Sequence, residues 1–246
     1  MPTSPSPVAL ITGGSRGIGA AISRRLAADG YTVAINYAGR REEAEALASE
    51  LAAAGAHAVA LQADVSDANA TRQLFDATEA RFGGLDVVVN SAGVLRLAPL
   101  AETEDSAFAQ VIGINLGGAF NVLRESARRV RDGGRIIALS TSVVGTRPEN
   151  YGAYAASKAA VETLCAILSK ELRGRGITVN AVAPGPTATE LFLDGKSPAL
   201  IERLAKLSPL ERLGTPDDIA GAVAFLAGAD GGWINGQVLR ANGGMV

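Results

Sequence analysis

The chain has 246 residues, of which 48% are hydrophobic, and its 23 basic and 25 acidic side chains give a formal net charge of −2. The charges are interspersed, so no basic surface for nucleic acid or an anionic membrane is indicated. The single cysteine, Cys165, excludes an internal disulfide, and the single histidine, His57, leaves little basis for a metal site or a Ser-His-Asp hydrolase. We therefore expect no metal, and any acid–base chemistry must use another side chain.

The chain begins with MPTSPSP, which contains neither a basic nor an apolar segment. We expect a short disordered lead-in over 1–6 rather than a secretory signal. The uncharged run 106–123 is interrupted by Gln110, Asn115 and Asn121, which makes it a poor membrane span. A cytoplasmic protein is the default expectation.

Apolar runs alternate with helical stretches along the rest of the chain. We expect strands at 8–14, 31–37, 57–64, 85–93, 134–142, 177–185 and 236–244, and helices at 17–29, 41–54, 67–82, 103–131, 153–173, 198–207 and after Pro216. The strand runs are apolar throughout, which is typical of parallel strands buried on both faces. This order predicts an α/β fold: a doubly wound Rossmann sheet of seven parallel strands with helices on both faces, forming a single domain over 1–246.

A glycine cluster lies between the first predicted strand and the first helix. The segment reads LITGGSRGIG, in which Gly13, Gly17 and Gly19 permit a tight turn and the close approach of a pyrophosphate. The helix that follows offers free N–H groups and the positive end of its dipole. The spacing is not the common G-x-G-x-x-G, but its place after a buried strand predicts a nucleotide site.

The end of the second predicted strand bears on the choice of nucleotide. An NAD enzyme usually has an acidic residue there for the ribose 2′-hydroxyl, whereas this chain has the neutral Asn36, followed by Arg40 and Arg41. A carboxylate ~4 Å from a 2′-phosphate would cost on the order of 4 kcal/mol at an effective dielectric constant of 20. With Arg16 available to pair with the phosphate, NADP(H) is favoured. Arg40 and Arg41 are equally well explained as the exposed start of a helix.

Two tyrosines precede one lysine in the segment SVVGTRPENYGAYAASK. Tyr154 is four residues before Lys158 and Tyr151 is seven before it, so helical spacing brings both toward one face. A free tyrosine has a pKa near 10, roughly 4 kcal/mol from proton exchange at neutrality. An ammonium ~4–5 Å away is worth about that much. We predict that Tyr154 is the acid–base group, while Tyr151 either packs at the helix entry or lines the substrate pocket.

Four motifs occur in order: TGGSRGIG (12–19), NSAG (90–93), a serine within STSVVG, and YAASK (154–158). Over nearly the whole chain the sequence resembles the short-chain dehydrogenase/reductase family, in particular members similar to 3-oxoacyl-acyl-carrier-protein reductases and carbonyl reductases. The resemblance implies catalytic roles for Asn115, Ser142, Tyr154 and Lys158, with Asn115 at a helix distortion. It further implies cofactor contacts from Gly13, Ser15, Arg16, Gly17, Ile18, Gly19, Asn36, Tyr37, Asp64, Val65, Asn90, Ala92, Gly93, Tyr154, Lys158, Pro184, Gly185, Thr187 and Thr189. Two departures stand out, because NSAG replaces a double Asn and the serine assignment could slip by two positions.

The same resemblance implies an NADPH-dependent oxidoreductase that reduces a ketone or aldehyde to an alcohol, a homotetramer, and a substrate lid over 187–215. Apolar ketones and 3-oxoacyl thioesters are the expected substrates, because Leu191, Phe192 and Leu193 could cover an apolar body. Core packing of a short helix explains these three equally well. The alternatives are a dehydrogenase of sugars or polyols and a non-catalytic NADP(H)-binding sensor. A methyltransferase would leave the tyrosine and lysine unexplained.

Overall fold

A computed structural model describes residues 6–246, so the expected lead-in lies almost wholly outside the described residues. The strands are β1 (Val8–Thr12), β2 (Thr32–Tyr37), β3 (Ala58–Gln62), β4 (Leu85–Asn90), β5 (Val130–Leu139), β6 (Thr178–Pro184) and β7 (Val238–Ala241). The α-helices are α1 (Gly17–Ala28), α2 (Arg41–Ala53), α3 (Ala68–Phe82), α4 (Asp105–Val111), α5 (Ala119–Arg129), α6 (Val143–Thr146), α7 (Gly152–Glu171), α8 (Glu190–Leu193), α9 (Pro198–Ala205) and α10 (Pro216–Ala227). Three further helical segments are η1 (Leu100–Glu102), the π-helix η2 (Ile112–Gly118) and η3 (Ala229–Trp233).

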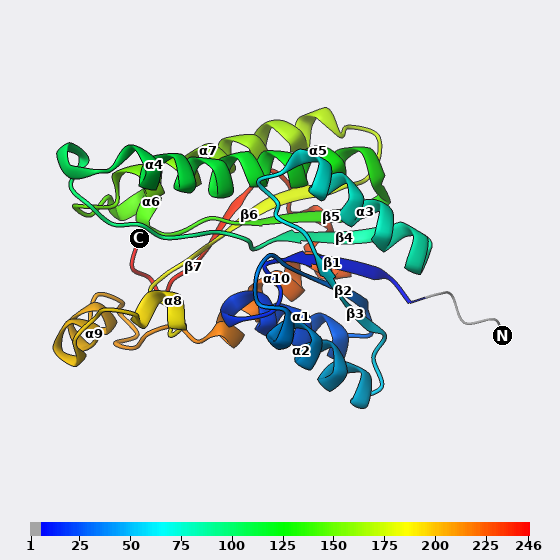
Figure 1. The fold of residues 1–246 in the computed structure, drawn as a ribbon, viewed down its shortest axis with the longest axis horizontal. Helices are drawn as coiled ribbons and strands as arrows, with labels where there is room; N and C mark the ends of the chain where they lie inside the picture. The colour runs from blue at the N-terminus through cyan, green and yellow to red at the C-terminus, as the bar shows by residue number, and fades with distance from the viewer. Residues whose placement is uncertain (1–5) are drawn as a thin grey trace.

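The seven strands form one parallel sheet in the order β3-β2-β1-β4-β5-β6-β7. Helices α3, α4, α5 and α7 cover one face and α1, α2 and α10 cover the other, as Figure 1 shows. This is the doubly wound Rossmann architecture that the sequence predicts. The strand order reverses between β1 and β4, where ligands of such sheets bind beyond the carboxyl ends of the strands.

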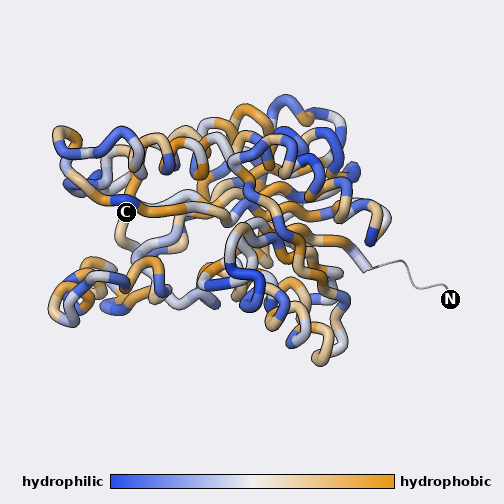
Figure 2. The backbone as a smooth tube through the Cα atoms, in the orientation of Figure 1, coloured by the Kyte–Doolittle hydropathy of each residue, from blue (hydrophilic) through white to orange (hydrophobic). Residues whose placement is uncertain are grey.

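Alternate residues of each strand pack into opposite faces of the sheet. On β1, Ala9 and Ile11 join the core beneath α1, α2 and α10, whereas Val8 and Leu10 join the core beneath α3, α5 and α7. Figure 2 shows the apolar strands in the middle of the molecule, with polar positions concentrated on the outer helices. Burial on both faces explains why the strands read as continuous apolar runs rather than alternating ones.

The helix expected over 103–131 is divided into three segments by the π-helix η2, which contains Asn115. Within residues 6–246, the stretch Asp105–Arg129 is the one helix long and apolar enough, by length and composition, to cross a membrane. Asn115, Asn121 and Glu125 are buried within this stretch, and α5 belongs to the core shared with α7. The core helix of an α/β protein passes the same test of length and composition.

Candidate active site and cofactor pocket

The glycine loop between β1 and α1 closes tightly on the neighbouring loop that follows β4. Gly13 has a φ of +60°, and a Cβ there would lie 2.9 Å from the Cα of Ala92. A Cβ on Gly19 would lie 2.1 Å from the carbonyl oxygen of Gly13. Neither position accepts a side chain, because both the turn and the close approach of the first turn of α1 require glycine. The residues present therefore fit a pyrophosphate at the N-terminus of a 12-residue helix.

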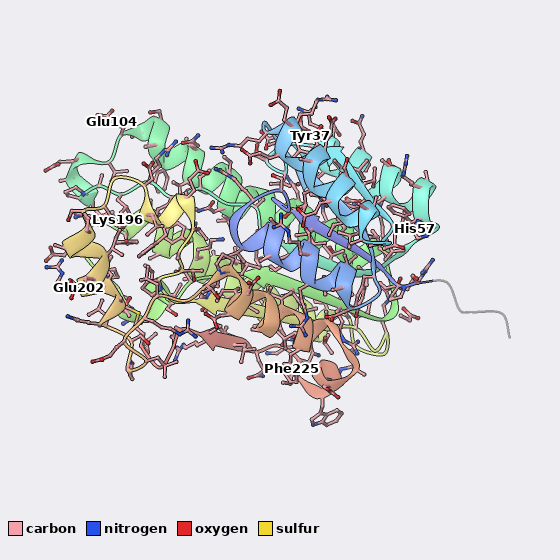
Figure 3. All side chains as sticks on the ribbon, turned by 90° about the horizontal axis from the view of Figure 1, so that it is seen from below. Tyr37, His57, Glu104, Lys196, Glu202 and Phe225 are labelled. Carbon is pink, nitrogen blue, oxygen red and sulfur yellow. The ribbon has the colours of Figure 1, made fainter. Side chains whose placement is uncertain are left out.

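A pocket of about 530 Å³ runs from this loop toward α6 and α7. Most of the residues expected to bind cofactor or substrate line it: Gly13, Arg16, Gly17, Ile18, Gly19, Asn36, Asp64, Val65, Ala92, Gly93, Ser142, Tyr154, Lys158, Pro184, Gly185, Thr187 and Thr189. The glycine loop and the tyrosine, far apart in the sequence, thus face one continuous space. His57 is exposed just before β3, and Figure 3 places it far from Lys196 and Glu202 of the 187–215 segment.

Four of the expected residues are not part of the pocket lining. The ring of Tyr37 is buried in the core beneath α1, α2 and α10, and the amide oxygen of Asn90 accepts from the Thr12 hydroxyl at 2.9 Å. Ser15 and Asn115 are likewise absent from the lining. Tyr37 is turned away from the pocket because side chains alternate between the two faces along β2, and its ring falls on the face that packs into the core. The side chains of Tyr37 and Asn90 are therefore engaged behind the pocket wall.

Asn115 holds the loop after β4 through two hydrogen bonds to one residue. Its amide oxygen accepts from the backbone N–H of Val94 at 2.8 Å, and its amide nitrogen donates to the Val94 carbonyl at 2.9 Å. A Cβ on Gly93 would lie 3.2 Å from this amide oxygen and 3.4 Å from Nζ of Lys158. Asn115, Gly93 and Lys158 are therefore packed together, and Asn115 positions the pocket wall.

Asn36 is also a positioning residue, although it borders the pocket. It is 1% exposed, and its amide nitrogen donates to the carbonyl oxygens of Ala63 at 3.0 Å and Leu61 at 3.3 Å. Its amide oxygen accepts from the N–H of Gly13 at 3.4 Å. The residue beyond the strand that is exposed and lines the pocket is Ala38. Sequence position alone did not distinguish Ala38 from the preceding strand residues.

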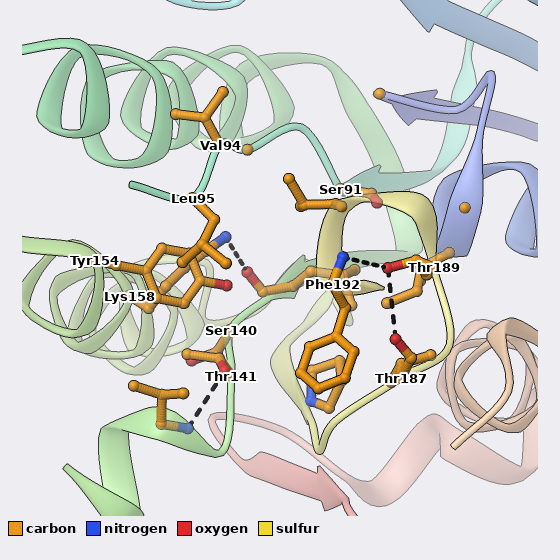
Figure 4. A pocket seen from close by; sticks show the side chains of 18 of the residues that line it. Ser91, Val94, Leu95, Ser140, Thr141, Tyr154, Lys158, Thr187, Thr189 and Phe192 are labelled. Atoms are coloured by element: carbon orange, nitrogen blue, oxygen red, sulfur yellow. Dashed lines mark hydrogen bonds between the residues drawn. The ribbon is translucent and has the colours of Figure 1, made fainter. Parts of the chain in front are cut away.

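Tyr154 and Lys158 project from α7 into the pocket, as Figure 4 shows. Burial raises the pKa of Tyr154 to about 12, and the side chain of Thr141 acts in the opposite direction. Burial lowers the pKa of Lys158 to about 8, and its Nζ donates to the carbonyl oxygen of Leu139 at 2.8 Å. We expected the ammonium to lower the pKa of the tyrosine. Instead, burial is the largest influence on both pKa values, because both groups are removed from water.

Three consecutive hydroxyl residues follow β5, and each has a different partner. Ser140 donates to a carboxylate oxygen of Glu162 on α7, whereas Ser142 donates to the carbonyl oxygen of Ala183 at 3.2 Å. Thr141 is 8% exposed; its hydroxyl oxygen accepts from the N–H of Val143 at 3.3 Å, and its side chain acts to lower the pKa of Tyr154. The expected serine therefore lines the pocket with its hydroxyl turned to the backbone, and the neighbouring threonine faces the tyrosine. Sequence reasoning passed over Thr141 because it sought a serine.

Tyr151 precedes α7 and lines the same pocket. Its ring lies edge-on to that of Tyr154, with the ring centroids 6.4 Å apart and the planes at 64°. Burial raises its pKa. Of the two interpretations left open for Tyr151, the structure favours pocket lining.

The substrate end of the pocket is largely apolar. It is lined by Val94, Leu95, Ile114, Leu191, Phe192, Leu204, Leu207 and Met245. Met245 belongs to a C-terminal segment that folds back on the loop after β5, since the Asn242 amide nitrogen donates to the Ser142 hydroxyl at 2.9 Å and to the Val246 carbonyl at 3.1 Å. A Cβ on Gly145 would lie 2.7 Å from a methyl of Val246. The C-terminal segment is thus part of the pocket wall.

The phosphate end carries two guanidinium groups and one carboxylate from a distant segment. Arg16 and Arg40 both donate to Glu190, the first residue of α8. Arg41 instead pairs with Glu45 of its own helix. The pairing of Arg41 with Glu45 follows from their i,i+4 spacing on one helix. No pattern in the sequence predicted that Glu190 would contact Arg16 and Arg40.

Comparison with known proteins places this arrangement in a family. A family model described as enoyl-(acyl carrier protein) reductase matches residues 13–246. Relatives and solved structures bearing the short-chain dehydrogenase/reductase name cover 92% or more of both chains. The chain therefore belongs to the short-chain dehydrogenase/reductase family and is an oxidoreductase.

Individual relatives carry more specific names. A chloroplastic NADPH-dependent aldehyde reductase-like protein of Arabidopsis thaliana is 45% identical over 97% of this chain and 94% of that protein. The 3-oxoacyl-acyl-carrier-protein reductase FabG of Staphylococcus aureus is 41% identical over 96% of this chain and 97% of that one. A solved short-chain dehydrogenase from Burkholderia cenocepacia in complex with NADP is 38% identical, with a TM-score of 0.92 over 97% of each chain.

Proposed function

We propose that this protein is an NADP(H)-dependent reductase that converts a ketone or aldehyde carbonyl to an alcohol. The observation that carries this proposal is the continuity of one pocket between the glycine cradle and the Thr141–Tyr154–Lys158 cluster. The test is loss of NADPH absorbance with a panel of carbonyl compounds. Activity with no carbonyl compound, together with tight NADPH binding, would instead favour the non-catalytic sensor.

The chemistry assigned to the chain is proton donation. The nicotinamide supplies a hydride when it is bound. As the substrate oxygen takes up negative charge, Tyr154 donates its hydroxyl proton to it. A pKa near 12 keeps that proton in place at neutral pH, which suits the reductive direction. Thr141 donates to the resulting tyrosinate, and Lys158 stabilises it by its charge.

Other residues named on sequence grounds act around this centre in our proposal. Ser142 holds the loop that carries Thr141, and Asn115 fixes the wall formed by Gly93 and Val94. Gly13, Gly17 and Gly19 admit the pyrophosphate, while Arg16 and Arg40 face the 2′-phosphate. The NADPH-dependent names and NADP-bound structures among the relatives support this cofactor.

The substrate is proposed to be apolar, either a medium-sized ketone or aldehyde or a 3-oxoacyl thioester. The leucines, phenylalanine and methionine at the substrate end support this, and the segment 187–215 that supplies most of them acts as the lid. A panel with apolar ketones, aldehydes, 3-oxoacyl thioesters, enoyl thioesters and sugars separates the candidates. A preference for polyol oxidation would favour the sugar dehydrogenase, and a preference for the enoyl thioester would move the reaction to a carbon–carbon double bond.

We further propose a cytoplasmic homotetramer of roughly 100 kDa, four times the 25.0 kDa chain. Two separate faces carry exposed apolar side chains. Phe108, Phe120 and Ile167 lie on α4, α5 and α7, while Phe225, Trp233 and Val238 lie on α10, η3 and β7. Two self-complementary interfaces generate a tetramer with dihedral symmetry. Light scattering that reports a monomer at micromolar concentration would contradict this assembly.

A further inference from the structure

Glu190 pairs with two arginines at the phosphate end of the pocket. One carboxylate oxygen accepts from Nη1 of Arg16 at 3.4 Å and from Nη1 of Arg40 at 3.3 Å. The other accepts from Nη2 of Arg40 at 3.4 Å. Arg16 belongs to the glycine loop and Arg40 precedes α2, so this one carboxylate joins three segments that are distant in sequence.

The contact also fixes where the lid begins. Thr189 caps α8 by accepting from the N–H of Phe192 at 3.2 Å, and a Cβ built on Gly17 would lie 3.5 Å from the Thr189 methyl. Glu190, the next residue, therefore stands at the mouth of the phosphate cradle. Figure 4 shows Thr189 and Phe192 on this segment, across the pocket from Tyr154 and Lys158.

In this cluster an ionised carboxylate is held by two guanidinium groups, as a bound phosphate would be. Hydrogen bonds and charge from Arg40, reinforced by Arg16, hold the pKa of the Glu190 carboxyl below its usual range, so it is ionised at neutral pH. Guanidinium forks bind carboxylate and phosphate groups in similar geometry. The three side chains are 47%, 47% and 65% exposed, and an ion pair this exposed is held weakly enough to be displaced.

We propose that Glu190 is a specificity-determining residue whose carboxylate occupies the place of the cofactor's 2′-phosphate and competes with it for Arg16 and Arg40. This inference rests on the proposed NADP(H) dependence. Binding of a 2′-phosphate displaces the carboxylate and releases the start of the lid. A cofactor without that phosphate leaves the carboxylate on its arginines.

The test is a comparison of Glu190→Gln with a matched control, Glu202→Gln. Glu202 lies in the same segment on α9; its one ion pair within residues 6–246 is the i,i+4 contact with Lys206, and Glu202 does not line the pocket. Dissociation constants for NADP⁺ and NAD⁺ are measured by calorimetry, so that turnover plays no part. We expect Glu190→Gln to tighten NADP⁺ binding three- to tenfold and to leave NAD⁺ within twofold, with Glu202→Gln unchanged for both.

A second measurement follows the accessibility of the lid segment to a protease. In the absence of cofactor, Glu190→Gln should speed tryptic cleavage after Lys196 at least threefold, whereas Glu202→Gln should not. An NADP⁺ to NAD⁺ affinity ratio within twofold of wild type, weaker NADP⁺ binding, or unchanged cleavage would overturn the inference. Equal binding of NADP⁺ and NAD⁺ by the wild-type protein would instead overturn the proposed cofactor, and cleavage would still test the contact of Glu190 with the arginines.

Discussion

The side chain of Thr141 acts on the hydroxyl of Tyr154 and lowers its pKa, while the hydroxyl of the adjacent Ser142 donates to the carbonyl oxygen of Ala183. The sequence motif STSVVG does not show which of its hydroxyl residues acts on the tyrosine and which one holds the loop, whereas the structure distinguishes them. One hydroxyl residue acts on the proton donor, and the next one holds the loop against β6. Each role predicts a different response to substitution.

Thr141→Val removes that hydroxyl with little change in volume. We expect kcat to fall roughly 10- to 100-fold, at the low end of what a positioned polar group contributes, and Thr141→Ser to restore most of it. Ser142→Ala should leave kcat within about threefold and cost on the order of 1 kcal/mol of stability, because Asn242 loses a partner. Steady-state kinetics with denaturation curves measure both. The reverse pattern would return the catalytic role to Ser142.

Tyr154→Phe should lower turnover by roughly 10²–10⁴, the usual contribution of a positioned acid–base group, while NADPH binding survives. Tyr151→Phe is the matched control, because it removes the same atom 6.4 Å away, ring centroid to ring centroid. It should change kcat by less than about tenfold and act mainly on KM. Lys158→Ala should impair both turnover and cofactor binding. If Tyr151→Phe is inactive and Tyr154→Phe still turns over, Tyr151 is the proton donor.

Lys158→Met should raise the thermal stability of the cofactor-free protein while abolishing activity. Burial lowers the pKa of Lys158 from its ordinary value of 10.5 to about 8, so at pH 7 the buried charge costs on the order of 3 kcal/mol. Between these two pKa values the unfolded chain binds more protons, so wild-type stability rises with pH and the advantage of the variant shrinks. Thermal unfolding at pH 7 and pH 9.5, at one protein concentration, measures this trend. A difference that does not change with pH would refute it.

Ala38→Asp should shift the cofactor preference from NADPH toward NADH by at least tenfold in kcat/KM, about 1.4 kcal/mol. A carboxylate at this exposed lining position repels a 2′-phosphate and can accept from a ribose hydroxyl. From the sequence alone, Asn36→Asp is the substitution expected to change the cofactor preference. In the structure it would direct a buried carboxylate at the carbonyl oxygens of Ala63 and Leu61. We therefore expect Asn36→Asp to lose stability as well. An Ala38→Asp variant that keeps the wild-type ratio would contradict this assignment.

Local chain patterns predicted most of the fold. The strands β1, β2, β4 and β6 read as largely apolar runs because both faces of the sheet are covered there, and Gly13 and Gly19 lie where the cradle admits no Cβ. The π-helix at Asn115 was expected only through resemblance, since no periodicity in IGINLGG announces it. The direction of side chains within a motif was not predictable. Thr141 and Ser142 are both small and polar, and only the path of the chain after β5 decides which faces Tyr154.

Contacts between distant segments were invisible for a different reason. Glu190 meets Arg16 and Arg40 across 174 and 150 residues of sequence, and no local pattern encodes such a pairing. The pKa values of Tyr154 and Lys158 have the same origin. Their spacing on α7 could be read from the sequence, but the extent of their desolvation depends on every element that closes over them.

The return of the C-terminal segment to the loop after β5 has a practical consequence for protein production. Asn242 ties Ser142 to Val246, and the Val246 side chain packs beside Gly145. An affinity tag fused after Val246 would have to leave through this packing, and it would disturb the residues that position Thr141. The start of β1 lies far from this C-terminal segment (Figure 1), so a tag joined at the N-terminus would not disturb this packing. Preparations that differ only in tag position should therefore differ in turnover while binding nucleotide alike.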